Sequence, residues 1–396
     1  MSERVMLNRF GFTRFISVVA GGTLGLLIGL CAWGLGSASA QESKTIVFDA
    51  PGADVTAGDF NGTYAGAINA RGVITGAYQD AGGTYHGFLR SPSGEFATFD
   101  APGADLTPGD YNGTFPSAMN DLGVITGVYW DVNGFSHGFL RDQEGRFTSF
   151  DVSGVGGYGS TPKAIDIEGA VVGYDLDSNY VFYAFVRNPD GSFKTFAGPG
   201  ACTTGTPNGC YGNEATAIGI RGTIAGNYMD SNFVSHGMLR HPDGTITKFD
   251  VPGAGTLPGS YQGTGCPGCS SGFNLRGEIA ATYTDGNNVH HGFVRSARGG
   301  FTTFDAPGAG SGAYQGTGCF SDCPVSLNNA GAITGQYIDA NLVQHGYLRS
   351  AEGRITSIDP QGSFYTFSSG INDSGAITGY YRDVNNVYHG FLRIPD

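Results

Sequence analysis

The sequence is poor in charge, and most of the charge that it carries is negative. Only 14% of the 396 residues are charged, with 21 Lys and Arg against 34 Asp and Glu, and the formal net charge is −13. Such a chain repels phosphate backbones and anionic lipid surfaces, so we expect no nucleic-acid partner. The sequence also has no evident nucleotide-binding, serine-hydrolase or EF-hand signature. We therefore predict no cofactor and no metal.

Long apolar runs are absent after the first forty residues. Arg4, Arg9 and Arg14 precede an apolar run over residues 15–35, and the small residues 37–40 suit signal peptidase. We predict a cleaved signal peptide over 1–40 and a secreted or periplasmic mature chain over 41–396, with no stable membrane insertion. The alternative is a retained anchor, because the apolar run is almost long enough to span a bilayer.

Glycine and aromatic residues are abundant, with 68 Gly, 20 Tyr and 27 Phe. This composition favours turns and strands over helices. The stretch 123–150 shows the pattern, because 124–131, 135–141 and 146–150 read as three short strands. Asn133-Gly134 predicts a two-residue hairpin turn, which would place Tyr129 opposite Gly138.

This unit recurs with a period of about fifty residues, the range of propeller blades. Each copy adds an inner strand that ends in a small–apolar–Asn–x–x–Gly signature or a close variant, so a unit has four strands. The signatures begin at Ala67, Ala118, Ala164, Ala217, Gly272, Ser326 and Gly370. The fold predicted is all-β, a single seven-bladed β-propeller of four-stranded blades.

The last unit ends before its fourth strand, and the missing strand lies at the other end of the mature chain. The sequence of residues 45–52 matches the outer-strand sequence of residues 97–103. We therefore predict that this N-terminal strand pairs with residues 387–393 and closes the last blade. Closure of this kind removes the exposed sheet edges of an open array.

The repeats share a His-Gly-Phe-Leu core, as at 86–89, 137–140 and 389–392. In this the chain resembles the HAF-type extracellular repeat proteins of bacteria, over essentially all of 45–396. The resemblance implies export and a repeated β architecture. It implies no established activity.

Histidine recurs at one position of the repeat, six residues after an Asp. The residues are His86, His137, His236, His291, His345 and His389. A catalytic site needs one constellation, whereas these residues form six copies around a ring. We predict that each imidazole is buried, is satisfied by a backbone or side-chain partner and holds its hairpin, and we predict no catalytic residue.

Six cysteines remain in the mature chain, in three pairs within successive inter-unit loops. The pairs are Cys202 and Cys210, Cys266 and Cys269, and Cys319 and Cys323. In an exported chain they predict three local disulfides. The alternative is a four-thiolate zinc site built from the last two pairs.

The loops between an outer strand and the next inner strand are long in five units, at 49–66, 100–117, 197–216, 250–272 and 305–326. Four of them share an aromatic–amide–Gly–Thr motif, as in residues 60–63. We predict a ligand surface here, formed by Asp59, Asn61, Tyr64, Asp110, Tyr111, Asn112, Tyr261, Gln262, Tyr314 and Gln315. The alternative is that the motif is only the turn and anchor of its own loop.

The function predicted is a secreted, non-enzymatic binding or scaffold module, monomeric, that binds a glycan or a protein on the face of the long loops. One alternative is a secreted polysaccharide hydrolase or lyase with acids drawn from Asp59, Asp110 and Glu214. Another is a cell-surface structural repeat protein.

Overall fold

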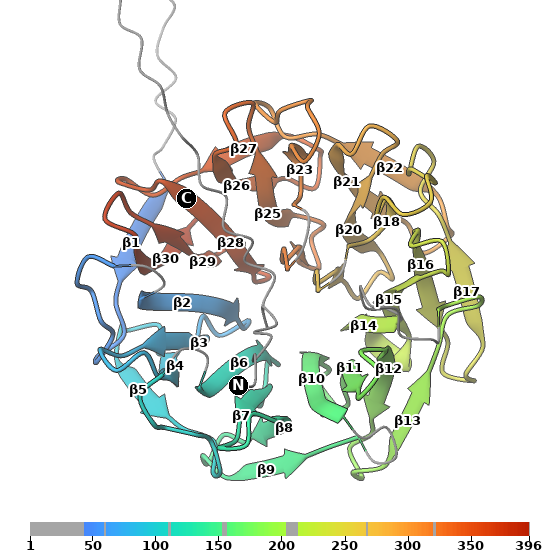
Figure 1. Cartoon of the computed structure of the whole chain (residues 1–396). Coiled ribbons are helices and arrows are strands. Elements are labelled where there is room, and N and C mark those ends of the chain that lie inside the picture. Colours follow the sequence, from blue (N-terminus) through green and yellow to red (C-terminus); the bar gives the residue numbers. More distant parts are fainter. Residues whose placement is uncertain are drawn as a thin grey trace, which may run out of the picture.

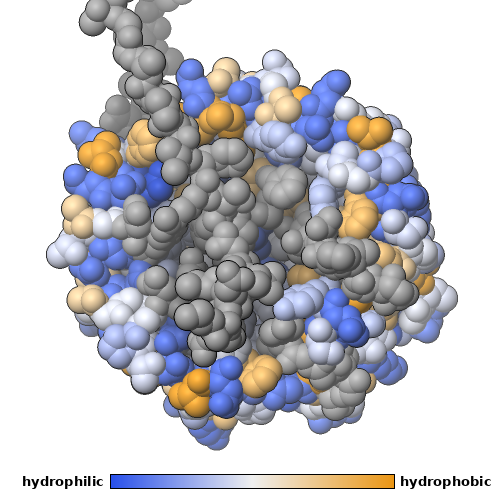
Figure 2. Space-filling view, viewed as in Figure 1, coloured by the Kyte–Doolittle hydropathy of each residue, from blue (hydrophilic) through white to orange (hydrophobic). Residues whose placement is uncertain are grey.

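The described part of this computed structural model comprises residues 43–58, 61–109, 112–152, 157–202, 213–266, 268–319 and 322–395. It consists of β-strands and one short 3-10 turn, η1 (Ile220–Gly222), and these ranges contain no α-helix, so the all-β prediction is confirmed. No helix in them could span a membrane. Figure 1 shows the strands as successive groups set around a central axis, and Figure 2 shows apolar residues scattered among polar ones around the visible rim. The predicted signal peptide lies outside the described residues.

The strands follow the predicted order, from an inner strand at the axis to an outer strand at the rim. The first three groups are β2 (Asn61–Ile68), β3 (Ile74–Gln79), β4 (Tyr85–Arg90) and β5 (Phe96–Phe99); β6 (Gly113–Met119), β7 (Ile125–Trp130), β8 (Ser136–Arg141) and β9 (Phe147–Phe150); and β10 (Gly157–Ile165), β11 (Val171–Asp177), β12 (Phe182–Arg187) and β13 (Phe193–Phe196). The next is β14 (Asn213–Ile218), β15 (Ile224–Met229), β16 (Ser235–Arg240) and β17 (Ile246–Phe249).

Two later groups have an inner strand in two short pieces. They are β18 (Gly263–Thr264), β19 (Gly272–Phe273), β20 (Ile279–Thr284), β21 (His290–Arg295) and β22 (Phe301–Phe304), and then β23 (Gly316–Thr317), β24 (Ser326–Leu327), β25 (Ile333–Ile338), β26 (Gln344–Arg349) and β27 (Ile355–Ile358). The disulfide loops interrupt these inner strands.

The final group takes its outer strand from the start of the chain. Its strands are β28 (Tyr365–Ile371), β29 (Ile377–Arg382), β30 (Val387–Ile394) and β1 (Lys44–Phe48). β1 pairs antiparallel with β30, with Phe48 opposite Gly390 and Lys44 opposite Ile394. The predicted pairing of the N-terminal strand with the end of the chain is thus present, and Figure 1 shows β1 beside β30.

The hydrogen bonds between strands form two sheets, of 16 and 14 strands, and neither sheet closes on itself. Within a sheet, neighbouring groups meet where an inner strand touches the third strand of the group before it. Gly113 of β6 lies opposite Tyr85 of β4, and Gly62 of β2 lies opposite Tyr388 of β30. The second of these contacts joins the first group to the last.

The hairpin between the second and third strands differs from the prediction by one residue. The amide of Asp131 donates to the carbonyl of Phe135, so three residues form the loop, and the left-handed residue is Gly134, with φ 78°. Asn133 instead donates its side-chain amide to the Asp131 carboxylate, at 3.1 Å. The turn is therefore a three-residue loop with a bulge, which shifts the register by one.

That shift places each Tyr of the repeat opposite the histidine and not opposite the glycine. Tyr129 pairs with His137, and Gly138 pairs with Phe150 of the outer strand. A Cβ added at Gly138 would lie 2.3 Å from the Phe150 ring. The predicted Tyr–Gly packing was therefore wrong, because the ring that covers the glycine comes from the outer strand.

Each repeated histidine bridges two carboxylates and stacks on a tyrosine. Its Nδ1 lies 2.7–3.0 Å from the Asp that follows the outer strand, and its Nε2 lies 3.3–3.9 Å from the Asp of the hairpin turn. The ring centroids of Tyr and His are 4.9–5.2 Å apart. The predicted role of holding the hairpin fits these contacts. His236 is buried as predicted, whereas the other five histidines are only partly buried.

Arginine links most groups to the one before, a contact that the sequence analysis missed. The Arg141 guanidinium lies 4.8 Å from the centre of the Phe99 ring, and Arg295 lies 5.1 Å from the centre of Phe249. Arg90 lies in the same way over Phe48 of β1, at 4.8 Å. These cation–π contacts recur at the group boundaries and include the boundary between the last group and the first.

The charged groups make stability depend on pH. The hydrogen bond that His86 donates to Asp100 raises the pKa of His86, and the one that His389 donates to Asp49 raises the pKa of His389. Burial raises the pKa of Glu214 to about 7 and that of Asp175 to about 6. A raised pKa means that the folded state holds protons which the unfolded chain has released, so this stability is lost as pH rises through the folded pKa.

We therefore expect the free energy of unfolding to fall between pH 5.5 and pH 8.5, by roughly 1–3 kcal/mol. Burial lowers the pKa of His290 to about 4, which opposes the trend only below the unfolded value of histidine. Urea denaturation at a series of pH values measures the effect. Glu214→Gln should flatten the curve, and a protein that is equally stable at both pH values would contradict the assignment.

Candidate binding site

The amide side chains of the long-loop motif bind within or beside their own loops. Asn61 Nδ2 donates to the carbonyl of Thr56 at 2.6 Å and to Asp54 at 3.2 Å. Gln262 Nε2 donates to the carbonyl of Gly286 at 3.2 Å, and Asn112 Nδ2 to that of Thr107. Gln315 Oε1 accepts from the amide of Gly312 at 2.8 Å. These amides hold the loops in shape.

The Gly and Thr of the motif have structural roles as well. A Cβ added at Gly62 would lie 2.0 Å from the carbonyl oxygen of Tyr388, so only glycine allows the loop to approach the preceding group. The Thr63 hydroxyl accepts the amide hydrogen of Ala50 at 2.9 Å, and Thr264 accepts that of Val251. The alternative reading of the motif, as turn and anchor, explains its amide, Gly and Thr.

The tyrosines among the predicted residues lie in different surroundings. Tyr261 packs beside Phe233, with ring centroids 5.7 Å apart, and Tyr314 is 54% exposed. Tyr64 is partly exposed and belongs to an aromatic cluster. Asp59, Asp110 and Tyr111 lie outside the described residues, so their predicted role stays a prediction.

The residue type differs between units at the inner-strand position directly after the motif Thr or its equivalent. The first, second and last groups have Tyr64, Phe115 and Phe367 there, and the fourth has Glu214. The fifth and sixth have Gly265 and Gly318. The units differ most where their inner strands begin, which is the signal that could have drawn attention to this position.

Aromatic rings collect around this position at the junction of the first and last groups. Tyr64 lies 4.8 Å from Tyr388, 5.4 Å from Tyr380 and 5.8 Å from Tyr85, measured between ring centroids. Phe367 stacks on Tyr380 at 4.6 Å. Tyr64, Phe367 and Tyr380 are partly exposed. Burial raises the pKa of Tyr64 well above its ordinary value, so its hydroxyl stays protonated at physiological pH.

Across the axis, the same level of the structure is polar. Glu214 is only 1% exposed, and both of its carboxylate oxygens accept from the amide of Gly268, at 2.9 and 3.1 Å. Lys163 Nζ donates to the carbonyl of Gly268 at 3.0 Å and lies 5.6 Å from the Tyr174 ring centre. Asp175, which stands where most units have Tyr, accepts from the Ser160 hydroxyl at 2.8 Å.

Two of the three predicted disulfides are present, Cys266–Cys269 and Cys319–Cys323. Cys210 lies outside the described residues, so the third pairing stays a prediction. The four-thiolate zinc alternative is not what the structure shows, because these sulfurs are paired. In the described ranges no three His, Cys, Asp or Glu side chains are placed to hold a metal ion.

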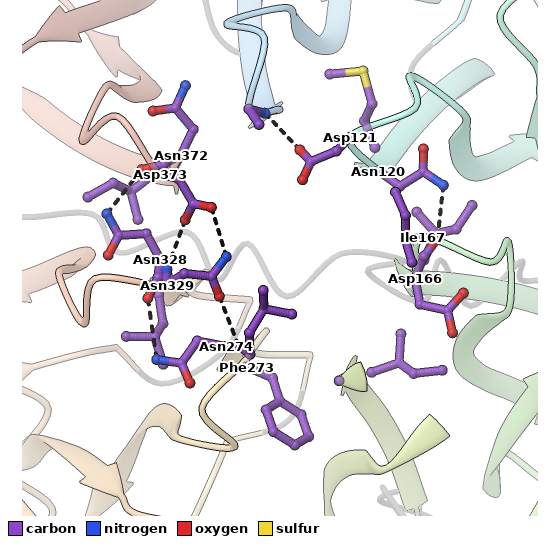
Figure 3. Close-up of a pocket in the computed structure, with 18 of the residues that line it drawn as sticks. Asn120, Asp121, Asp166, Ile167, Phe273, Asn274, Asn328, Asn329, Asn372 and Asp373 are labelled. Atoms are coloured by element: carbon purple, nitrogen blue, oxygen red, sulfur yellow. Dashed lines mark hydrogen bonds between the residues drawn. The ribbon is translucent and has the colours of Figure 1, made fainter. Parts of the chain in front are cut away.

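The other end of the axis has a cavity of about 310 Å³, where the inner strands end. Figure 3 shows asparagines from several units beside it, among them Asn120, Asn274, Asn328 and Asn372. Asn120 Nδ2 donates to the carbonyl of Asp166, Asn328 to that of Asn372, and Asn372 to that of Asn69. These side-chain amides hydrogen-bond one unit to the next, so we interpret them as structural residues and not as ligand-binding residues.

No family model matches this sequence, and no curated protein matches it. Solved structures do match. The chain is 11% identical to a catalytically inactive virginiamycin B lyase from Staphylococcus aureus, solved with quinupristin, with a TM-score of 0.53 over 89% of this chain and 100% of that one. A lectin from Burkholderia pseudomallei gives 11% identity and a TM-score of 0.52, over 83% and 96%.

A puromycin hydrolase structure gives 13% identity and a TM-score of 0.50, over 81% of this chain and 50% of that one. At these identities the likeness shows the fold alone, which is that of the β-propellers. The resemblance to HAF-type proteins rests on the repeats and is not confirmed by any family match.

Proposed function

We propose that this chain is a non-enzymatic binding module, built as one closed ring of seven four-stranded blades after a signal peptide, and that it binds a glycan at the loop end of its axis. The observation that carries the proposal is the loss of the repeat at this end. Residues that build the ring recur in most units, whereas the position after the motif Thr is occupied by Tyr64, Phe115, Phe367 and Glu214 in different units.

The chemistry of this end suits a sugar. The partly exposed rings of Tyr64, Phe367 and Tyr380 offer apolar faces for the C–H side of a pyranose. The predicted loop residues Asp59, Asp110 and Tyr111 would supply polar groups that bind its hydroxyls.

Three contacts between the two ends of the described chain support the proposed closed ring. Asn372 bonds to the backbone of Asn69 at 3.0 Å, β1 pairs with β30, and Arg90 lies over Phe48. The first and third contacts are of the kind that joins other neighbouring units, and the pairing of β1 with β30 is of the kind that adds the outer strand within a unit. All three are made here between the two ends of the chain.

A polysaccharide hydrolase or lyase is the second candidate. It is favoured by Glu214, whose pKa is raised by burial to about 7, because a carboxylic acid that stays protonated near neutral pH can act as a general acid. Its carboxylate is, however, only 1% exposed and bonded to Gly268. The negative charge of neighbouring Asp322 also raises the pKa of Glu214.

The test is a glycan and cell-wall polysaccharide array with the mature chain, followed by titration of any hit. We expect Tyr64→Leu, which replaces the aromatic face by a smaller apolar side chain, to weaken binding about tenfold. The control is Phe135→Ala, which removes a 45% exposed aromatic from a hairpin turn. Loss of binding in the control alone would refute the site, and release of reducing sugar from the hit would favour the enzyme.

A further inference from the structure

The two disulfides form one cluster although they belong to different units. Cys266, Cys269 and Cys323 are buried together, and Cys319, which is partly exposed, packs against them. Backbone bonds hold the two loops to each other, from the amide of Ser270 to the carbonyl of Cys323 and from the amide of Val325 to the carbonyl of Ser270, each at 3.3 Å. The loops therefore stay side by side independently of the sulfur bonds.

Neither disulfide is needed to stabilise the fold. The paired cysteines are 3 and 4 residues apart in sequence, and closing such short loops constrains the unfolded chain little. The loop between Cys266 and Cys269 is anchored by other means, because Glu214 and Lys163 both bond to the backbone of Gly268. A short disulfide with a two-residue spacer is instead the arrangement found in exchangeable thiol pairs.

We propose that this cluster is a thiol–disulfide exchange site, with Cys319–Cys323 as the entry pair and Cys266–Cys269 as the pair behind it. The co-reactant is a small dithiol. The proposal is independent of glycan binding and adds a redox activity to the same end of the molecule. The order of the two pairs follows from exposure, since Cys319 is the one cysteine of the four that is partly exposed.

The exchange balances in two steps. One thiolate of the dithiol attacks Cys319 Sγ, Cys323 leaves as a thiolate, and the second thiol of the reagent resolves the mixed disulfide. The dithiol is oxidised to its disulfide, and Cys319 and Cys323 receive its two electrons and two protons. Cys323 then attacks the inner disulfide, and Cys319 resolves that intermediate, which reoxidises the entry pair and leaves Cys266 and Cys269 as thiols.

Three charged groups are placed around the inner loop. Lys163 bonds to the carbonyl of Gly268, Glu214 bonds to its amide, and Asp322 adds a negative charge beside them. A nearby ammonium favours a thiolate, whereas a carboxylate disfavours it. Lys163 and Glu214 are positioning residues that act through this backbone.

The test uses the whole mature chain with dithiothreitol as the probe, quenched by alkylation at intervals and read by mass spectrometry. With dithiothreitol limiting, we expect Cys319 and Cys323 to be alkylated at the shortest quench times and Cys266 and Cys269 only afterwards, while alkylation of the entry pair declines because the second step reoxidises it. In the double variant Cys319→Ser and Cys323→Ser, reduction of the inner pair should be slower by about tenfold or more. Lys163→Gln should move the pH profile of the inner-pair rate to higher pH.

Three results would overturn the proposal: simultaneous or reversed labelling in the unmodified protein, an unchanged inner-pair rate in the double variant, and resistance of both pairs to a glutathione redox buffer in which exchangeable disulfides open. The labelling order needs no variant, so it decides the question even if the double variant fails to fold. Glycan binding measured on the same samples separates this outcome from that of the proposed function.

Discussion

Removal of residues 41–52 is expected to cost at least about 4 kcal/mol of the free energy of unfolding and to cause aggregation. The segment includes β1, whose Phe48 is 8% exposed and lies between the Phe88 and Phe96 rings, at 6.3 and 5.9 Å. It also includes Asp49, which bonds to His389 at 2.9 Å. Without it, β30 becomes an exposed edge that can pair with another chain.

Urea denaturation and size-exclusion chromatography measure this effect. The matched control is removal of 41–43 alone, which leaves β1 in place and should melt like the mature chain. Phe48→Ala should account for most of the loss, because truncating a buried phenylalanine costs about 3–5 kcal/mol. A 41–52 deletion that stays monomeric and as stable as its control would mean that β1 does not complete the last group in solution.

The repeated features of the sequence predicted the strands well, because each one has a local physical cause. A period-two apolar pattern between glycine turns specifies a strand whatever surrounds it. The match between residues 45–52 and 97–103 predicted the pairing of β1 with β30, because similar sequences in a repeat protein occupy equivalent positions in the fold. These predictions needed no knowledge of contacts between units.

The register of the hairpins could not be obtained in the same way. Asn133-Gly134 suits a two-residue turn and equally a three-residue loop with glycine in the bulge, and only the contacts of Asp131 decide between them. Its carboxylate accepts from the amides of Asn133 and Phe135, both at 2.9 Å, which fixes the longer loop. Burial by itself raises the pKa of Asp131, and these hydrogen bonds outweigh it, so the pKa is lowered.

The candidate site was harder still to predict, because the amide, Gly and Thr of the conspicuous loop motif also make contacts that hold the fold. The aromatic–amide–Gly–Thr motif recurs because each unit needs the same contact with the one before it. Tyr64 and Glu214 attract less attention in sequence, yet both stand at equivalent positions near the start of their inner strands. Residues at this position differ between units, and a search for recurring patterns discards such residues.

The Gly62→Ala variant should be among the most damaging single changes in the protein, with an expected cost above about 4 kcal/mol. Gly62 has φ 117°, a conformation that alanine tolerates poorly, and its added Cβ would meet the Tyr388 carbonyl at 2.0 Å. Backbone stands on both sides of this contact, so no side chain can move aside, and the first group must separate from the last. Gly286→Ala is the control, because it has no heavy atom within 4 Å and no positive φ, and it should change stability by less than about 0.5 kcal/mol. Equal urea midpoints for the two variants would show that β2 and β30 do not meet in solution. That result would refute the proposed closed ring.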